Sequence, residues 1–387
     1  MSGQLEEYCE LISGRHIPVK QYNTDSRGMG YLTGPSDFGP LHPVVSKWSE
    51  HPQSTALPGD ILITVKGSGV GKINLLNGEE VAISRQLMAI RPKDINPRFL
   101  YLFIDSKFEH FQSKANGAAI PGISRDDVLE LELPPFSLAE QKRIVSILDE
   151  AFSAIAKAKE NAEKNLLSAR ELFESYLNRV FTQQGPGWQE TDLSKICSIE
   201  SKLVDPRDPE HIDLPHIGAG NMVSQSDELE DVLTAREEGL ISNKYGYDTS
   251  MVLYSKIRPY LMKVSRPSFD GLCSADVYPL KPVAGTLERD FLFYILLSKP
   301  FTDYAIAGSA RAGMPKVNRK HLFAYNLAIP AVEEQRRLTA SIGNLSSEAR
   351  RLETIYTQKL ANLDELRQVL LQKAFTGQLT MREQVAV

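Results

Sequence analysis

Two long stretches of the chain place apolar residues at alternating steps of four and three, the pattern of a helix that packs along one face. The first stretch lies between Pro135 and Gly185 and contains neither Gly nor Pro. The second runs from residue 331 to Gly377 and is broken only by Gly343. A seven-residue repeat of this kind requires a partner helix. We therefore predict two helices of about 45 residues, roughly 65 to 70 Å long at 1.5 Å per residue, that form a coiled coil.

Each apolar row is interrupted by one lysine, Lys159 in the first helix and Lys359 in the second. The first helix leads away from one globular stretch into another, and the second helix runs back. If the two helices pair within one chain, they must therefore be antiparallel, with the globular stretches at opposite ends and an approximate two-fold axis across the coil. The residues expected to form the contact are Leu148, Phe152, Ile155, Leu166, Phe173, Leu345, Leu352, Tyr356, Leu363 and Leu370.

The stretches outside the helices are rich in Gly and Pro and contain short apolar runs, such as residues 60–65 and 251–255. Turn signals that recur at short intervals predict short strands with a few helices. The fold class is therefore α+β, with two mixed α/β domains separated by the two long helices. The predicted segments are a first domain at 1–135, a first helix at 136–183, a second domain at 184–330, a second helix at 331–379 and a tail at 380–387.

The second half of the chain is a diverged copy of the first. Glu-Gln-Lys-Arg at 140–143 recurs as Glu-Gln-Arg-Arg at 334–337, and the same offset without a gap carries Phe-Thr at 181–182 onto Phe-Thr at 375–376. Further upstream the offset shifts slightly, as loop insertions would cause. The matches there are Ser84 with Ser274, Cys9 with Cys197, and residues 59–63 with 249–253.

Composition narrows the class of protein. The 387 residues include 44 Lys and Arg and 49 Asp and Glu, a net charge of −5, which excludes a histone-like protein that binds polyanions through bulk charge. The three cysteines form no CxxC pair and predict buried thiols in a reducing, cytoplasmic compartment. We see no secretory signal at the N-terminus and no apolar run long enough to span a bilayer, so no membrane partner is expected.

Two segments imitate catalytic motifs without completing them. Residues 67–72 (Gly-Ser-Gly-Val-Gly-Lys) resemble a phosphate loop, but Lys66 and Ile73 occupy positions that require Gly and Ser or Thr. A hairpin tip, or a loop whose backbone and lysines contact a nucleic-acid phosphate, are the alternatives. Residues 133–136 (Leu-Pro-Pro-Phe) resemble the Asn-Pro-Pro-Tyr/Phe loop of adenine methyltransferases, but Leu133 cannot accept a hydrogen bond. We therefore predict no catalytic residue, no bound cofactor and no metal site on this chain.

Basic residues gather in both copies despite the acidic total. Such groups are usually a solvated surface, here at hairpin tips, but their recurrence favours contact with nucleic acid. The candidate DNA-binding residues are Lys66, Ser68, Lys72, Arg85, Lys256, Arg258, Lys263, Arg311, Lys316 and Arg319. Lys66, Lys72 and Arg85 in the first copy, and Lys256, Arg258 and Lys263 in the second, are expected to flank strands at equivalent positions of the repeat.

Taken together, these residues resemble the specificity (S) subunit of type I DNA restriction-modification enzymes. The resemblance lies in the Glu-Gln-Lys/Arg-Arg helix starts at 140 and 334, each preceded by Pro, and in the Phe-Thr ends at 181 and 375. Residues 31–34 and 216–219 are similar to early strands of the family's target-recognition domains. The duplication extends this likeness over nearly the whole chain.

The resemblance implies a non-catalytic subunit in which each domain recognises one half of a split double-stranded DNA site. It implies that the helices set the spacing and bind two methyltransferase subunits, which carry S-adenosylmethionine and adenine-N6 chemistry. Where the system cuts DNA, two motor-nuclease subunits that use ATP and Mg would join. The alternatives are a methyltransferase or nuclease in its own right, and a coiled-coil adaptor without a nucleic-acid role.

Overall fold

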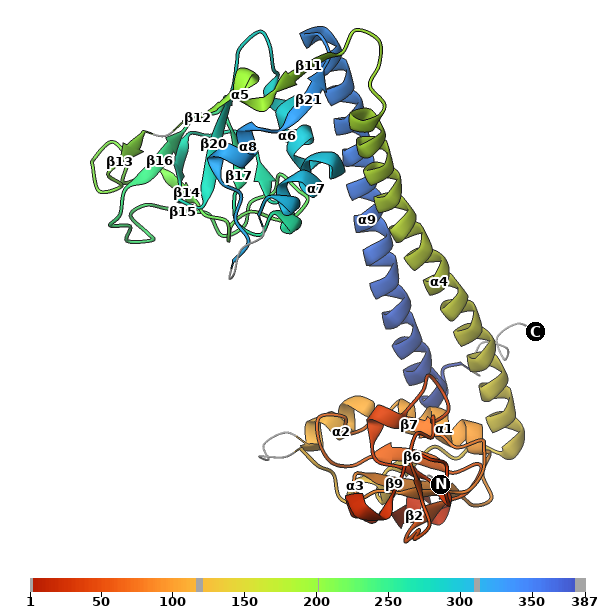
Figure 1. Ribbon diagram of the computed structural model, residues 1–387. Helices are drawn as coiled ribbons and strands as arrows, with labels where there is room; N and C mark the ends of the chain where they lie inside the picture. Colours follow the sequence, from red (N-terminus) through yellow and green to blue (C-terminus); the bar gives the residue numbers. More distant parts are fainter. Residues whose placement is uncertain (1–2, 116–120, 201, 310–313, 380–387) are drawn as a thin grey trace, which may run out of the picture. The chain divides into compact units, whose positions relative to one another are not determined.

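The computed structural model describes residues 3–115, 121–200, 202–309 and 314–379, so Arg311 and the tail at 380–387 lie outside the described residues. The chain forms two compact units (Figure 1). Unit 1 comprises residues 1–163 and 358–387, and unit 2 comprises residues 164–357. Each unit therefore contains part of both long helices.

Unit 1 is built from two four-stranded sheets and one two-stranded sheet. The strand Ile61–Thr64 is buried at every position, because its alternate side chains belong to two different cores, Ile61 and Ile63 to one and Leu62 to the other. The first sheet has the order β2 (Cys9–Ser13), β9 (Leu87–Pro92), β6 (Ile61–Thr64) and β7 (Ile73–Leu75). The second has the order β4 (Trp48–Ser49), β3 (Met29–Leu32), β8 (Val81–Ile83) and β5 (Thr55–Ala56), and β1 (Gly3–Gln4) pairs with β10 (Glu132–Leu133).

Unit 2 repeats this topology and adds one strand. Its first sheet has the order β12 (Cys197–Ile199), β20 (Val277–Pro282), β17 (Val252–Ser255) and β18 (Val264–Ser265). Its second has the order β13 (Leu203–Val204), β16 (Lys244–Tyr247), β19 (Gly271–Cys273), β14 (Pro215–Ile217) and β15 (Leu233–Thr234). The two-stranded sheet is formed by β11 (Gln189–Asp192) and β21 (Asn326–Ile329).

The strand pairing confirms the duplication and corrects one match. β3 runs parallel to β8, as β14 runs parallel to β19, and all the other pairs are antiparallel. The structure aligns β6 (61–64) with β17 (252–255), whereas the sequence comparison matched 59–63 with 249–253. The correct register lies one residue further along, and a one-residue shift moves every side chain to the opposite face of a strand.

Short helices cover the sheets in the same order in both units. The helices α1 and α6 are buried along most of their length, and their apolar residues form part of the core of each unit. Unit 1 contains α1 (Pro97–Asp105), α2 (Phe108–Ala115) and α3 (Asp126–Leu129), and unit 2 contains α5 (Leu193–Ile196), α6 (Arg289–Leu297), α7 (Lys299–Ala307) and α8 (Arg319–Phe323).

The two long helices are α4 (Leu138–Thr182) and α9 (Val332–Phe375), and they pair antiparallel within each unit (Figure 1). In unit 1 the start of α4 and the end of α9 share one core, which includes Leu148 and Leu371. In unit 2 the end of α4 and the start of α9 share another, which includes Val180 and Ile342. The predicted antiparallel pairing within one chain is confirmed.

Of the ten residues predicted to form the contact between the helices, nine are buried or partly buried and Leu352 is exposed. Lys159, which interrupts the row, forms an ion pair with Asp364 of α9. Leu352 lies 36% exposed, because the buried row passes from Ala349 to Glu353 and Tyr356, and Glu353 forms an ion pair with Arg170. Of the other predicted contact residues, Leu148 and Ile155 are buried, and the remaining ones are partly buried: Phe152, Leu166, Phe173, Leu345, Tyr356, Leu363 and Leu370.

The repeated Glu-Gln pair at the start of each long helix has a structural explanation. Gln141 Oε1 accepts a hydrogen bond from the backbone N–H of Asn96 at 3.0 Å, and Gln335 Oε1 accepts one from Glu288 at 2.9 Å. Asn96 and Glu288 are the residues that precede the first turns of α1 and α6. A buried amide therefore fastens α4 to α1 in unit 1 and α9 to α6 in unit 2.

The pairing of the helices can be checked by crosslinking within unit 1. Lys159→Cys combined with Asp364→Cys should react with a short bismaleimide, because the side chains of Lys159 and Asp364 touch. The native cysteines are buried and should not compete. Lys159→Cys with Gln372→Cys is the control, since residue 372 lies about 12 Å further along the helix. Equal crosslinking of the two pairs, measured by mass spectrometry, would contradict this register.

Candidate nucleic-acid interface

A loop with the same backbone structure follows the central strand of each unit, at residues 65–72 in unit 1 and 256–263 in unit 2. In unit 1 the N–H of Thr64 donates to the carbonyl of Lys72 at 2.9 Å, and in unit 2 the N–H of Ser255 donates to that of Lys263 at 3.0 Å. A second bond closes the turn inside each loop, from Val70 to Gly67 and from Leu261 to Arg258. These bonds make Lys72 and Lys263 structurally equivalent.

Each loop is held by the segment that precedes α3 or α8. The N–H of Gly67 donates to Pro121 O, and the N–H of Arg258 donates to Pro315 O, both at 2.9 Å. A bridge pairs Lys66 with Gly122, and the matching bridge pairs Ile257 with Lys316. Residues 65–72 with 121–125, and 256–263 with 315–319, therefore form one surface in each unit, called here the loop surface.

This alignment corrects the matching of the basic residues. The prediction placed Lys66, Lys72 and Arg85 opposite Lys256, Arg258 and Lys263. In the structure only Lys72 and Lys263 are equivalent, because the bridges place Lys66 opposite Ile257. Arg85, which follows Ser84, lies opposite Ala275, which follows Ser274. The excess of basic residues is common to both loop surfaces, but the individual charges are not.

The candidate residues of unit 1 face solvent. Lys66, Ser68, Lys72 and Arg85 are all exposed. Within the described ranges, no hydrogen-bond or ion-pair partner is found for the ammonium groups of Lys66 and Lys72 or for the guanidinium of Arg85. An unpaired exposed cation is available to an anion such as a phosphate, and these three residues of unit 1 meet that condition.

Most candidate residues of unit 2 already have partners. The ammonium of Lys256 is buried and bonds to the carbonyl of Ala275, and burial together with the nearby charge of Lys316 lowers its pKa. Lys263 Nζ donates to Ala219 O at 2.7 Å. Lys316 Nζ lies 3.5 Å from an oxygen of Asp276. These three lysines connect the loop surface to neighbouring segments of unit 2.

Arg319 and Arg258 complete the set in unit 2. Arg319 donates to the hydroxyl of Tyr245 at 3.4 Å and lies over the ring of Tyr278. Arg258 is exposed, and its guanidinium has no hydrogen-bond or ion-pair partner among the residues that the structure describes. Of the candidates described in unit 2, Arg258 is therefore the one with an unpaired charge.

Neither catalytic look-alike has the structure of its motif. Residues 67–72 lead into the strand β7, whereas a phosphate loop opens a helix. Gly67 and Gly71 have φ of 94° and 81°, a backbone conformation that favours glycine, so these two residues allow the chain to turn. Leu133 is 3% exposed and pairs with Gly3 in the sheet β1–β10, so the Pro-Pro segment joins this sheet to α4.

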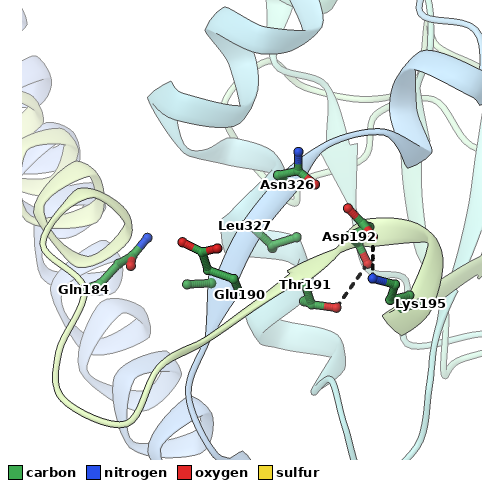
Figure 2. A pocket seen from close by; sticks show the side chains of 8 residues that line it. Gln184, Glu190, Thr191, Asp192, Lys195, Asn326 and Leu327 are labelled. Atoms are coloured by element: carbon green, nitrogen blue, oxygen red, sulfur yellow. Dashed lines mark hydrogen bonds and ion pairs between the residues drawn. The ribbon is translucent and has the colours of Figure 1, made fainter.

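A groove with a volume of about 440 Å³ lies in unit 2 beside β11 and β21 (Figure 2). Its polar side chains come from the two strands, from Gln184 and from Lys195 of α5, and the charge of Asp192 is paired with Lys195 at 2.6 Å. The described residues contain no group of three or more His, Cys, Asp or Glu side chains placed to hold a metal ion.

Two residues in or beside the loop surface of unit 2 were not among the predicted site residues. Tyr260, which is 52% exposed in the loop, was not singled out because an isolated aromatic residue has no sequence signal of its own. Asp276 joins Lys256 and Lys316, at 3.9 and 3.5 Å. The carbonyl of Asp276 accepts from the N–H of Lys256, as that of Gln86 accepts from Val65, and this pairing of distant segments has no local sequence signal.

Comparison with known proteins identifies the type of domain. Residues 1–165 match the family described as the type I restriction modification DNA specificity domain. The EcoDI type I restriction enzyme specificity subunit of Escherichia coli is 27% identical over 352 residues, which cover 82% of this chain and 78% of that protein. The MjaVIII specificity subunit of Methanocaldococcus jannaschii is 20% identical over 84% of this chain and 80% of its own length.

Two solved structures share the fold over nearly the whole chain. One, from work on complex assembly and conformational transition of the type I R-M system, has a TM-score of 0.77 at 21% identity and covers 98% of both chains. The HsdS subunit from Thermoanaerobacter tengcongensis has a TM-score of 0.62 at 20% identity and covers 98% of this chain and 97% of that one. No helix in the described part of the chain is both long and apolar enough to cross a membrane.

Proposed function

We infer that this chain belongs to the DNA specificity subunits of type I restriction-modification systems and is the non-catalytic subunit that selects the DNA site. The observation that carries the inference is the duplicated loop surface, on which Lys66 and Lys72 in unit 1 and Arg258 in unit 2 are exposed cations without a partner among the described residues. A polyanion such as DNA is the ligand that such cations attract. Methyltransferase and restriction subunits are the partners that membership of the family implies.

The finer assignments are our proposal. The globular segments 1–135 and 184–330 each recognise one half of a bipartite site. The helical segments 136–183 and 331–379 set the spacing and bind two methyltransferase subunits, and two motor-nuclease subunits join where DNA is cut. S-adenosylmethionine, ATP and Mg then belong to those partners. In support, the two globular parts have the same topology, and neither look-alike motif on this chain has the structure that cofactor chemistry requires.

A domain exchange tests this proposal. Replacing residues 186–330 by the second domain of another family member should change one half of the methylated motif and leave the other half intact, because each unit has its own core. The readout is single-molecule mapping of methylated adenines in cells that express the chain with its methyltransferase subunits.

The exchange has a control in the reciprocal replacement of residues 1–135, which should change the other half. A change of both halves in either exchange would show that the units do not read DNA independently. An unmodified genome with the wild-type complex would contradict the proposed function itself.

A further inference from the structure

The loop at 256–263 holds two side chains in a backbone conformation that favours glycine. Arg258 and Met262 both have φ of 49°, and the equivalent residues of unit 1 are Gly67 and Gly71. Glycine adopts this conformation without steric cost, whereas the Cβ of any other residue crowds the neighbouring carbonyl. Unit 2 thus keeps side chains at two positions where its own duplicate shows that glycine fits.

Packing explains only one of the two. Met262 is partly buried against the core of unit 2, and its carbonyl accepts a hydrogen bond from the N–H of Gln225 at 3.1 Å. The Arg258 side chain is exposed, and among the described residues its guanidinium is unpaired. A strained residue without a packing role is characteristic of a binding site, where the side chain is retained for its ligand.

The surroundings of Arg258 fit a nucleic acid. Lys316, Arg319 and Lys320 lie on the segment that holds the loop, and Asp276, the acid beside them, is engaged with Lys256 and Lys316. A concentrated positive surface draws in the phosphate backbone and brings the loop against the grooves.

Another position of the loop also differs in its side chain between the two units. Tyr260 is 52% exposed beside Arg258, whereas the matching residue of unit 1 is Gly69, where a Cβ would lie 2.6 Å from Pro35 Cγ. Unit 1 therefore has no room for a side chain at this point of the loop. Unit 2 presents an aromatic ring and a guanidinium there.

We propose that Arg258 is the specificity-determining residue of unit 2, that it recognises a guanine edge in the major groove with Tyr260 packed beside it, and that the glycine loop of unit 1 contacts phosphate alone. This inference rests on the proposed function. The planar guanidinium offers the two parallel donors that guanine O6 and N7 accept.

The test uses the assembled complex with Arg258→Gly, the residue of the duplicate, and with Arg258→Lys. Both variants should lose about 5- to 150-fold in discrimination at one guanine of the half-site read by unit 2, the range that corresponds to roughly 1 to 3 kcal/mol. The other half of the motif should not change. Arg258→Lys should keep the affinity for DNA, because its charge remains. Thermal unfolding of Arg258→Gly should not begin at a lower temperature, because glycine relieves the strained backbone.

The control is Asp231→Gly, which replaces another residue of unit 2 with φ of 49°. Thermal unfolding of this variant should also not begin at a lower temperature, and the methylated motif should be unchanged. An unchanged methylated motif in an active Arg258→Gly complex would overturn the inference. A lowered melting temperature together with loss of recognition of both halves of the motif would also overturn it, because that result would indicate a structural role for Arg258. Absence of any bipartite motif with the wild-type complex would instead refute the function on which the inference rests.

Discussion

Replacing Lys66 and Lys72 together by alanine should weaken the binding of the complex to all DNA sequences by roughly tenfold to a hundredfold at physiological salt. Both ammonium groups are exposed and without a partner in the described part of unit 1. Contacts to phosphate position a protein without reading sequence. The slope of log affinity against log salt concentration should therefore fall by about two units, and the methylated motif should stay the same.

The matched control removes the same charge from elsewhere in unit 1. Lys20→Ala with Lys93→Ala changes the net charge equally, and Lys93 is already 3.6 Å from Glu10. Fluorescence anisotropy over a series of salt concentrations should show nearly unchanged binding for this control. Equal slopes of log affinity against log salt concentration for the two double variants would contradict this prediction. Lys66 and Lys72 would then be solvated side chains at a hairpin tip, the alternative given for the basic residues.

Gln335→Ala should destabilise the fold by about 2 to 4 kcal/mol, because it leaves buried backbone groups without partners. The Gln335 side chain is 0% exposed and makes three hydrogen bonds, accepting from the N–H of Glu288 and donating to the carbonyls of Thr286 and Pro330, each at 2.9 Å. The melting temperature should fall by roughly 5 to 10 °C for a unit of this size.

Gln141→Ala should lower stability less, because two hydrogen bonds are found for that side chain, to the N–H of Asn96 and the carbonyl of Phe136. The control is Gln368→Ala, the same substitution at an exposed position of α9, which should have almost no effect. Calorimetry would detect the difference, and a melting temperature of Gln335→Ala within a degree of the wild type would show that the amide does not fasten α9 to α6.

Much of the architecture could be predicted from local patterns. The seven-residue row on each helix is a property of side-chain spacing alone, and the structure has helices at 138–182 and 332–375 with a buried row along each. The glutamine of the repeated Glu-Gln pair was recognised as a signature but not as a hydrogen-bonding group. Its partners Asn96 and Glu288 are 45 and 47 residues away, and no local pattern connects them.

The sequence predicted that basic residues gather at the candidate site, but it did not predict which of them are buried or paired. Charge counting cannot distinguish Lys256, whose ammonium is buried and bonded to the protein, from Arg258, whose guanidinium faces solvent two residues later. The repeat comparison also placed β6 and β17 one residue out of register, because short apolar strands match one another almost equally well at neighbouring offsets.

The sequence by itself determined that the chain is duplicated, that each copy ends in a long helix, and that the helices must pair antiparallel, since these follow from periodicity and from the order of segments. Only the tertiary structure decided which cations are unpaired and which residues of the two loops correspond. Those properties depend on hydrogen bonds between segments far apart in the sequence, such as 256–258 with 315–317. Burial and pairing are set by what the fold brings next to a side chain, and the identity of the side chain alone does not contain that information.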